Sequence, residues 1–231
     1  MASKSSSSMS PAEPRSKRRL CRYCRGLATN SMPSCTTPVW RPPAPWKTCR
    51  SLSFGRVMET NFFGVLGLTR ALLPTFRAQR RGRIVIVSSE AAFIGQPTNS
   101  IYCASKWAVE GWAEAVAYEL EPFGIDIILV EPGPYRTEIW DSTPRIQPPD
   151  SPYHAWVQHV FRAGDAHAAR MARDPREVAL VIAHALEARR PRFRYPVGPF
   201  ARLNHFLRGK LPSRLLRRAT ALYLGLSRVR Q

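Results

Sequence analysis

The hydrophobic positions of the chain form short continuous runs and longer stretches with helical spacing. The runs within 83–88 and 125–130 are almost wholly apolar, which is typical of strands buried on both faces of a parallel sheet. Residues 54–79 and 102–121 carry apolar side chains at helical spacing, which predicts two long helices. Pro74 is expected to kink or shorten the first of these. The alternation predicts an α/β fold.

The second half of the chain continues this pattern. A helix is expected over 174–188, where an Asp-Pro pair opens a helical stretch, and a short last strand over 194–197. Residues 138–172 are the variable part of the chain. They gather large apolar side chains, namely Trp140, Tyr153, Trp156, Val157, Val160 and Phe161.

Three polar residues stand at the junction between the first apolar run and the second long helix. Tyr102 and Lys106 are four residues apart and therefore share one face of a helix. Ser89 lies thirteen residues before Tyr102, directly after the run. A free tyrosine has a pKa of about 10, and a nearby ammonium favours its ionised form. The group therefore suits proton transfer at an alcohol or carbonyl oxygen.

With these spacings, Tyr102-Cys-Ala-Ser-Lys106 resembles the YxASK motif of the short-chain dehydrogenase/reductase family. The resemblance covers about residues 52–230. It implies the C-terminal half only of a Rossmann-like, doubly wound parallel sheet. It also implies an NAD- or NADP-dependent oxidoreductase that interconverts a secondary alcohol and a ketone or aldehyde.

The resemblance assigns roles to individual residues. Tyr102 becomes the proton donor or acceptor, Lys106 binds the cofactor ribose and favours the phenolate, and Ser89 hydrogen-bonds the substrate oxygen. Asn61 completes a proton relay. The Pro132-Gly133 turn and Thr137 lie against the nicotinamide end of the cofactor, which Tyr102 and Lys106 also contact.

Further local matches resemble the branch of 17β-hydroxysteroid and retinol dehydrogenases. They are Glu110-Gly111, Pro122-Phe-Gly124 and Glu131-Pro-Gly-Pro134. This resemblance implies a lipophilic alcohol or carbonyl substrate. It also implies a homodimer or tetramer through the helices 54–79 and 102–121, and a cytoplasmic location.

Residues 1–51 do not follow the pattern of the rest. They are rich in Ser and basic residues, residues 1–50 hold seven of the 21 prolines, and no periodicity is present. One hypothesis is a disordered segment. The other is translation in a shifted frame, because the codons of residues 32–39 permit Ala-Val-Val-His-Asn-Ala-Gly when shifted, which resembles the family's strand that ends in an NAG turn. Residues 52–231 are then the catalytic half of the domain.

The family's glycine-rich TGxxxGxG turn does not occur in the 231 residues. That turn holds the cofactor pyrophosphate at a helix N-terminus. The sequence therefore predicts weak dinucleotide binding and impaired turnover. With fewer neighbouring strands, exposed side chains are expected in the two apolar runs, namely Ile84, Val85, Ile86, Ile127, Ile128 and Leu129, and with them a tendency to aggregate.

The net charge of +19 is unevenly distributed along the chain. Residues 51–201 hold 17 basic and 15 acidic side chains, whereas residues 202–230 hold eight basic ones and no acid. Without a nucleic-acid-reading motif, this pattern argues against a nucleic-acid partner. Two alternatives to a soluble enzyme stay open: a non-catalytic binding protein of the same fold, and a peripheral membrane enzyme that uses the basic, amphipathic segment 202–230.

No metal site is expected. Cys21 and Cys24 form a CxxC pair, but Cys35 and Cys49 follow at spacings unlike a zinc site. The five histidines are interpreted as surface or structural residues: His154, His159, His167, His184 and His205.

Overall fold

The computed structural model describes residues 51–138 and 150–226. Helices and strands alternate along them, so the expected α/β fold is confirmed. In chain order the elements are α1 (Ser51–Met58), η3 (Glu59–Phe63), α2 (Gly64–Gln79), β1 (Gly82–Val87), η4 (Glu90–Ala92), α3 (Ser100–Leu120), η5 (Glu121–Phe123), β2 (Ile125–Pro132), α5 (His154–Met171), α6 (Arg176–Glu187), β3 (Arg194–Val197), α7 (Pro199–Arg208) and α8 (Ser213–Tyr223). The two hypotheses on residues 1–51 concern a segment that, apart from Ser51 in α1, lies outside the described residues.

Three parallel strands form the sheet in the order β1-β2-β3. Gly82 of β1 is level with Ile125 of β2, and the register continues to Val87 and Val130. Beyond β2, Leu129 pairs with Arg194, the first residue of β3. All three strands therefore end at the same edge, which is where ligands bind in open α/β sheets.

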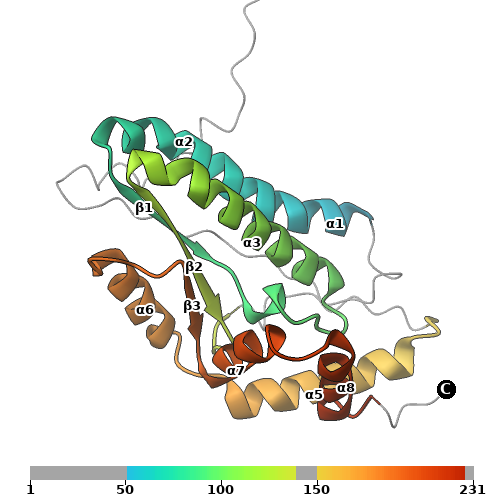
Figure 1. Cartoon of the computed structure of the whole chain (residues 1–231). Coiled ribbons are helices and arrows are strands. Elements are labelled where there is room, and N and C mark those ends of the chain that lie inside the picture. The colour runs from blue at the N-terminus through green and yellow to red at the C-terminus, as the bar shows by residue number, and fades with distance from the viewer. Residues whose placement is uncertain (1–50, 139–149, 227–231) are drawn as a thin grey trace, which may run out of the picture. The chain divides into compact units, whose positions relative to one another are not determined.

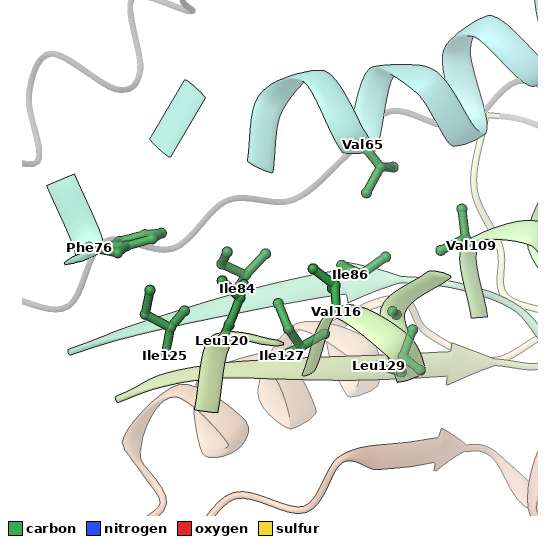
Figure 2. Close-up of a cluster of buried hydrophobic side chains, with 11 residues drawn as sticks. Val65, Phe76, Ile84, Ile86, Val109, Val116, Leu120, Ile125, Ile127 and Leu129 are labelled. Atoms are coloured by element: carbon green, nitrogen blue, oxygen red, sulfur yellow. The ribbon is translucent and has the colours of Figure 1, made fainter. Parts of the chain in front are cut away.

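Helices cover both faces of the described sheet. The continuous rod of α1, η3 and α2 lies beside α3 on one face, and α6 packs against the other (Figure 1). Figure 2 shows the first layer, where Val65 and Phe76 of α2 and Leu120 of α3 point toward the strand side chains. Alternate strand residues Val85, Ile128 and Val130 face α6 instead.

This two-sided cover corrects the expectation that the strand side chains are exposed. Every one of the residues concerned is at most 4% exposed: Ile84, Val85, Ile86, Ile127, Ile128 and Leu129. The expectation was wrong because burial of these side chains depends on the helices above and below the sheet, not on further strands beside it. The helices α2 and α3 supply that cover on one face, and α6 supplies it on the other.

The first long helix differs from its prediction in one informative way. It ends at Gln79 as expected, but Pro74 neither ends nor shortens it. The irregularity lies earlier, at Glu59–Phe63, where the backbone widens into a π-helical turn around the buried Asn61. Such turns occur frequently at functional sites.

The other boundaries lie within two residues of the predictions. β1 begins and ends one residue early, α3 begins two residues early, and β2 extends to Pro132. The short strand 194–197 is confirmed. The basic segment after it forms α7 and α8.

A glycine fixes the start of β2 against the start of β1. Gly124 has a left-handed backbone with φ of 69°. A Cβ at this position would lie only 2.4 Å from the carbonyl oxygen of Arg80. The Gly124 carbonyl in turn accepts a hydrogen bond of 3.1 Å from Gly82 N. Close backbone contact here sets the register of the two strands.

We therefore expect Gly124→Ala to lower the free energy of unfolding by about 2 kcal/mol or more, because it adds backbone strain and a steric clash. Gly67→Ala is the matched control, since a Cβ there meets nothing within 4 Å. In the middle of α2 it should stabilise by up to about 1 kcal/mol. Chemical denaturation of both variants measures the difference. Equal stability of Gly124→Ala and the wild type would contradict the role of this glycine.

Candidate active site

The carboxyl ends of β1 and β2 bring the predicted site residues to one edge of the sheet. Ser89 follows β1 by two residues, and Pro132 is the last residue of β2. Together with Tyr102, Gly133 and Thr137 they line a cleft of about 1060 Å³. The structure therefore brings these five predicted site residues together at one cleft.

Tyr102 and Lys106 lie on the face of α3 that packs toward the sheet. Tyr102 is 8% exposed and lines the cleft, whereas Lys106 is only 1% exposed and lies behind it. The Lys106 Nζ donates a 2.9 Å hydrogen bond to the carbonyl of Val87, the last residue of β1. The same nitrogen lies 5.8 Å from the centroid of the Tyr102 ring.

Burial lowers the pKa of Lys106 to about 7. The physical cause is the cost of removing an ammonium from water. Near neutral pH both the charged and the neutral form of the Lys106 amine are therefore populated. A small change in its surroundings shifts the ratio of the two forms. A lysine with such a pKa beside a cleft is a candidate functional residue.

Ser89 caps the short helix η4. Its Oγ accepts a 3.2 Å hydrogen bond from Ala91 N. An oxygen that accepts a backbone bond keeps its own O–H group as a donor. The hydroxyl can therefore donate to an oxygen atom of a ligand in the cleft.

Asn61 contacts α3 at the residue next to Lys106. Its Nδ2 donates a 3.0 Å hydrogen bond to Ser105 Oγ, and that hydroxyl donates a 2.8 Å bond to the carbonyl of Tyr102. Asn61 is 1% exposed. The π-helical turn in the first rod is thus bonded directly to the segment that carries Tyr102 and Lys106. Ser105 was missed in the sequence, although it stands inside the Tyr102–Lys106 motif.

The turn after β2 is held by backbone bonds on both sides. Gly133 N donates a 3.1 Å bond to the carbonyl of Val197, and Arg136 N donates a 2.9 Å bond to the carbonyl of Arg173. Thr137, at the end of the turn, is exposed. These bonds fix the backbone next to the cleft without using the side chains of the turn.

A charged cluster lies beneath this turn. Glu131 is fully buried and receives a 2.9 Å hydrogen bond from Arg194, which also contacts Glu110 and Glu114. His205 Nδ1 lies 3.4 Å from Glu131 Oε2. Burial raises the pKa of Glu131 to about 7 in spite of the arginine. No local pattern in the sequence indicates this cluster, because its members come from four separate elements, α3, β2, β3 and α7.

A polar row on the cleft wall was also missed. Glu90, Gln96, Asn99 and Asn204 all line the cleft beside Ser89 and Tyr102. Asn204 comes from α7, more than a hundred residues after Glu90, so no local pattern could connect them. The described residues contain no cluster of His, Cys, Asp or Glu that could hold a metal ion.

Comparison with known proteins agrees with this geometry. The sequence model of the short chain dehydrogenase family matches residues 42–147. A 3-ketodihydrosphingosine reductase from Bacteroides thetaiotaomicron is 33% identical over 173 residues, which is 73% of this chain and 64% of that protein. Retinol dehydrogenase 8 from Bos taurus is 49% identical over 82 residues, or 36% of this chain and 26% of that protein.

A solved structure shares the fold over most of the chain. It is a short-chain dehydrogenase from Streptomyces avermitilis, 27% identical, with a TM-score of 0.66 over 92% of this chain and 74% of that one. The chain spans between 58% and 64% of the length of curated relatives that it matches over most of its own length. On these matches and on the geometry of Ser89, Tyr102 and Lys106, the chain belongs to the short-chain dehydrogenase/reductase family.

Proposed function

We propose that this protein is an NAD- or NADP-dependent oxidoreductase that interconverts secondary alcohols and ketones or aldehydes. The observation that carries the proposal is the position of Tyr102 and Ser89 in one cleft, with the buried amine of Lys106 directly behind the tyrosine. Membership of the family supports the same reaction class.

The described residues fit the nicotinamide end of a dinucleotide. The cleft lies at the carboxyl ends of β1 and β2 and has room for a ring against the turn at Pro132 and Gly133. Tyr102, Pro132, Gly133 and Thr137 would hold this end, with Lys106 behind Tyr102. The described residues include no glycine-rich turn for a pyrophosphate, so the fit concerns the nicotinamide half.

A bound nicotinamide supplies the acceptor or donor of the hydride. The chain's own residues handle the proton. Tyr102 takes the proton from the substrate hydroxyl in oxidation and returns it in reduction. The Ser89 hydroxyl donates a hydrogen bond to the same substrate oxygen and stabilises the charge that develops there.

Lys106 and Asn61 act on Tyr102 and its helix. When Lys106 carries its proton, the ammonium favours the phenolate form of the neighbouring tyrosine. With a pKa of about 7, this support is present at and below neutral pH. The Asn61–Ser105–Tyr102 hydrogen bonds hold the first turn of the motif in place.

We further propose a lipophilic substrate. The part of the cleft far from Ser89 is walled by apolar side chains of α5, α6 and α8, among them Phe161, Ile182 and Leu216. Two relatives carry names that refer to a ketodihydrosphingosine and to retinol. Pairing of two copies through the paired rods of α1–α2 and α3 also remains a proposal, by resemblance to the family.

A second candidate role concerns the membrane surface. The helices α7 and α8 expose large apolar side chains, among them Leu203, Phe206, Leu215 and Leu222, each at least 48% exposed. The same helices carry arginines and no acid, a combination that suits anionic lipid headgroups. Within residues 51–138 and 150–226, none of the helices has the length and apolar character of a bilayer-spanning segment.

Replacing Leu215 and Leu222 together by Ser should weaken binding to vesicles that contain phosphatidylserine by at least about tenfold, because two apolar side chains leave the bilayer surface. Co-sedimentation measures the bound fraction. Leu180→Ser is the control, since Leu180 is 62% exposed on the separate helix α6. Unchanged binding of the double variant, or equal loss in the control, would rule out this role.

Tyr102→Phe should reduce hydride transfer by about 10²–10⁴-fold, because the phenol that exchanges the proton is gone. Tyr118→Phe on the same helix is the control, since its ring is 72% exposed. The assay is a single turnover with protein in excess over substrate and with saturating NAD or NADP, so that weak cofactor binding does not limit the measured rate. The absorbance of the reduced cofactor measures hydride transfer. Retained transfer in Tyr102→Phe would refute the assigned role.

The buried amine predicts a pH effect on stability that needs no cofactor. The pKa of Lys106 falls from 10.5 to about 7 on folding. Between these values the unfolded chain binds more protons than the folded one, so stability rises with pH. In wild type, relative to Lys106→Met, the unfolding free energy should rise by up to about 1.4 kcal/mol per pH unit between pH 7 and 9. Urea denaturation of both proteins at several pH values measures this difference. If the unfolding free energies of wild type and Lys106→Met change with pH in the same way, the amine is not desolvated on folding.

A further inference from the structure

The polar row on the cleft wall is a connected set of hydrogen bonds around one carboxylate. Glu90 Oε2 accepts a 3.2 Å bond from Asn204 Nδ2, and Oε1 accepts a 3.5 Å bond from Gln96 Nε2. Gln96 Oε1 in turn accepts a 3.5 Å bond from Asn99 Nδ2. The amides fix the orientation of the Glu90 carboxylate, which would otherwise rotate freely.

This carboxylate lies close to the reacting centre. Glu90 directly follows Ser89, so their Cα atoms are about 3.8 Å apart. An ideal Cβ on Gly133 would lie 3.7 Å from Glu90 Oε2, which places the carboxylate between the Ser89 loop and the turn after β2. A polar group of the substrate that is attached within a few bonds of the reacting carbon can therefore contact the Glu90 carboxylate.

The charge of the cleft is opposite to that of the chain. The sequence has 35 Lys and Arg residues against 16 Asp and Glu. Yet the described residues that line the cleft include no Lys or Arg, whereas Glu90, Glu138 and Asp165 all line it. An anionic substrate finds no counter-charge here, and a cationic one does.

Burial strengthens the preference at Glu90. The residue is 9% exposed, so its carboxylate lies largely away from water. A charge in such surroundings attracts an opposite charge more strongly than it does in bulk water. Apolar side chains also line the cleft, Val160, Leu207 and Leu224 among them.

We propose that Glu90 selects substrates with an ammonium group close to the reacting carbon and a hydrocarbon tail beyond it, that is, long-chain amino alcohols and amino ketones. This inference rests on the proposed oxidoreductase function. Glu90 is a specificity residue that binds the substrate's amine, while Ser89 and Tyr102 act on its oxygen. Gln96 and Asn204 are positioning residues for the Glu90 carboxylate.

Calorimetric titration of the 231-residue chain with three probes tests the proposal. The probes are a twelve-carbon vicinal amino alcohol, the same secondary alcohol without the amine, and the N-acetylated amino alcohol, all below their micelle concentrations. The amine should bind about tenfold to a hundredfold more tightly than the other two, as expected for a charge-assisted hydrogen bond. If the wild-type protein binds the three probes with equal affinity, or binds none of them, the proposal is wrong.

Glu90→Gln keeps the shape of the side chain and removes its charge. In this variant the ratio of affinities between the amine and the other probes should fall to about one, whereas Glu119→Gln, an exposed change on α3, should keep the wild-type ratio. A preference that survives Glu90→Gln would overturn the assignment to this residue. Hydride transfer from the bound amino alcohol is measured separately, so a preference without any transfer would refute the oxidoreductase function and leave the binding preference established.

Discussion

The parallel pairing of β1 and β2 is the constraint on which the rest of the described structure depends. Because Val87 and Val130 are level in the register, the segments that follow the two strands start at the same edge of the sheet. Ser89 and the turn from Pro132 to Thr137 therefore face one cleft. A shift of one residue would move the buried side chains of a strand to the opposite face, so the hydrophobic layers on both faces hold this register.

Hydrogen bonds tie the helix α3 to the elements around the site, to β1 through Lys106 and to the π-helical turn through Ser105. Lys106 reaches from α3 to the carbonyl of Val87 and thereby ties the helix to the carboxyl end of β1. This bond links the helix that carries Tyr102 to the strand end at the cleft. Burial of the amine, and not the bond itself, lowers the pKa of Lys106 to about 7.

The lining of the cleft combines two kinds of side chain. It includes the hydrogen-bonded row around Glu90, next to Ser89, and apolar side chains of α5, α6 and α8. The proposed lipophilic substrate and the proposed ammonium group near its reacting carbon are therefore compatible with one cleft. The helices α7 and α8 contribute side chains to the cleft and also to an exposed apolar and basic surface. The same pair of helices therefore borders both the cleft and this surface.

The sequence by itself determined the main elements and the residues of the candidate site. Continuous apolar runs specified β1 and β2, because a strand buried on both faces needs apolar residues at every position. The spacing of Ser89, Tyr102 and Lys106 specified the site, because a helix and a strand end place those positions together. Both are local patterns, which a sequence displays directly.

Only the tertiary structure decided the rest. The burial of Ile84 and Ile128 depends on how helices pack on the two faces of the sheet, so the sequence predicted exposure where the side chains are buried. The bonds from Asn61 to Ser105 and from Asn204 to Glu90 join residues separated by 44 and 114 positions. The low pKa of Lys106 comes from the removal of water by surrounding elements. Long-range packing and desolvation are sums over many residues, and no motif in the sequence records them.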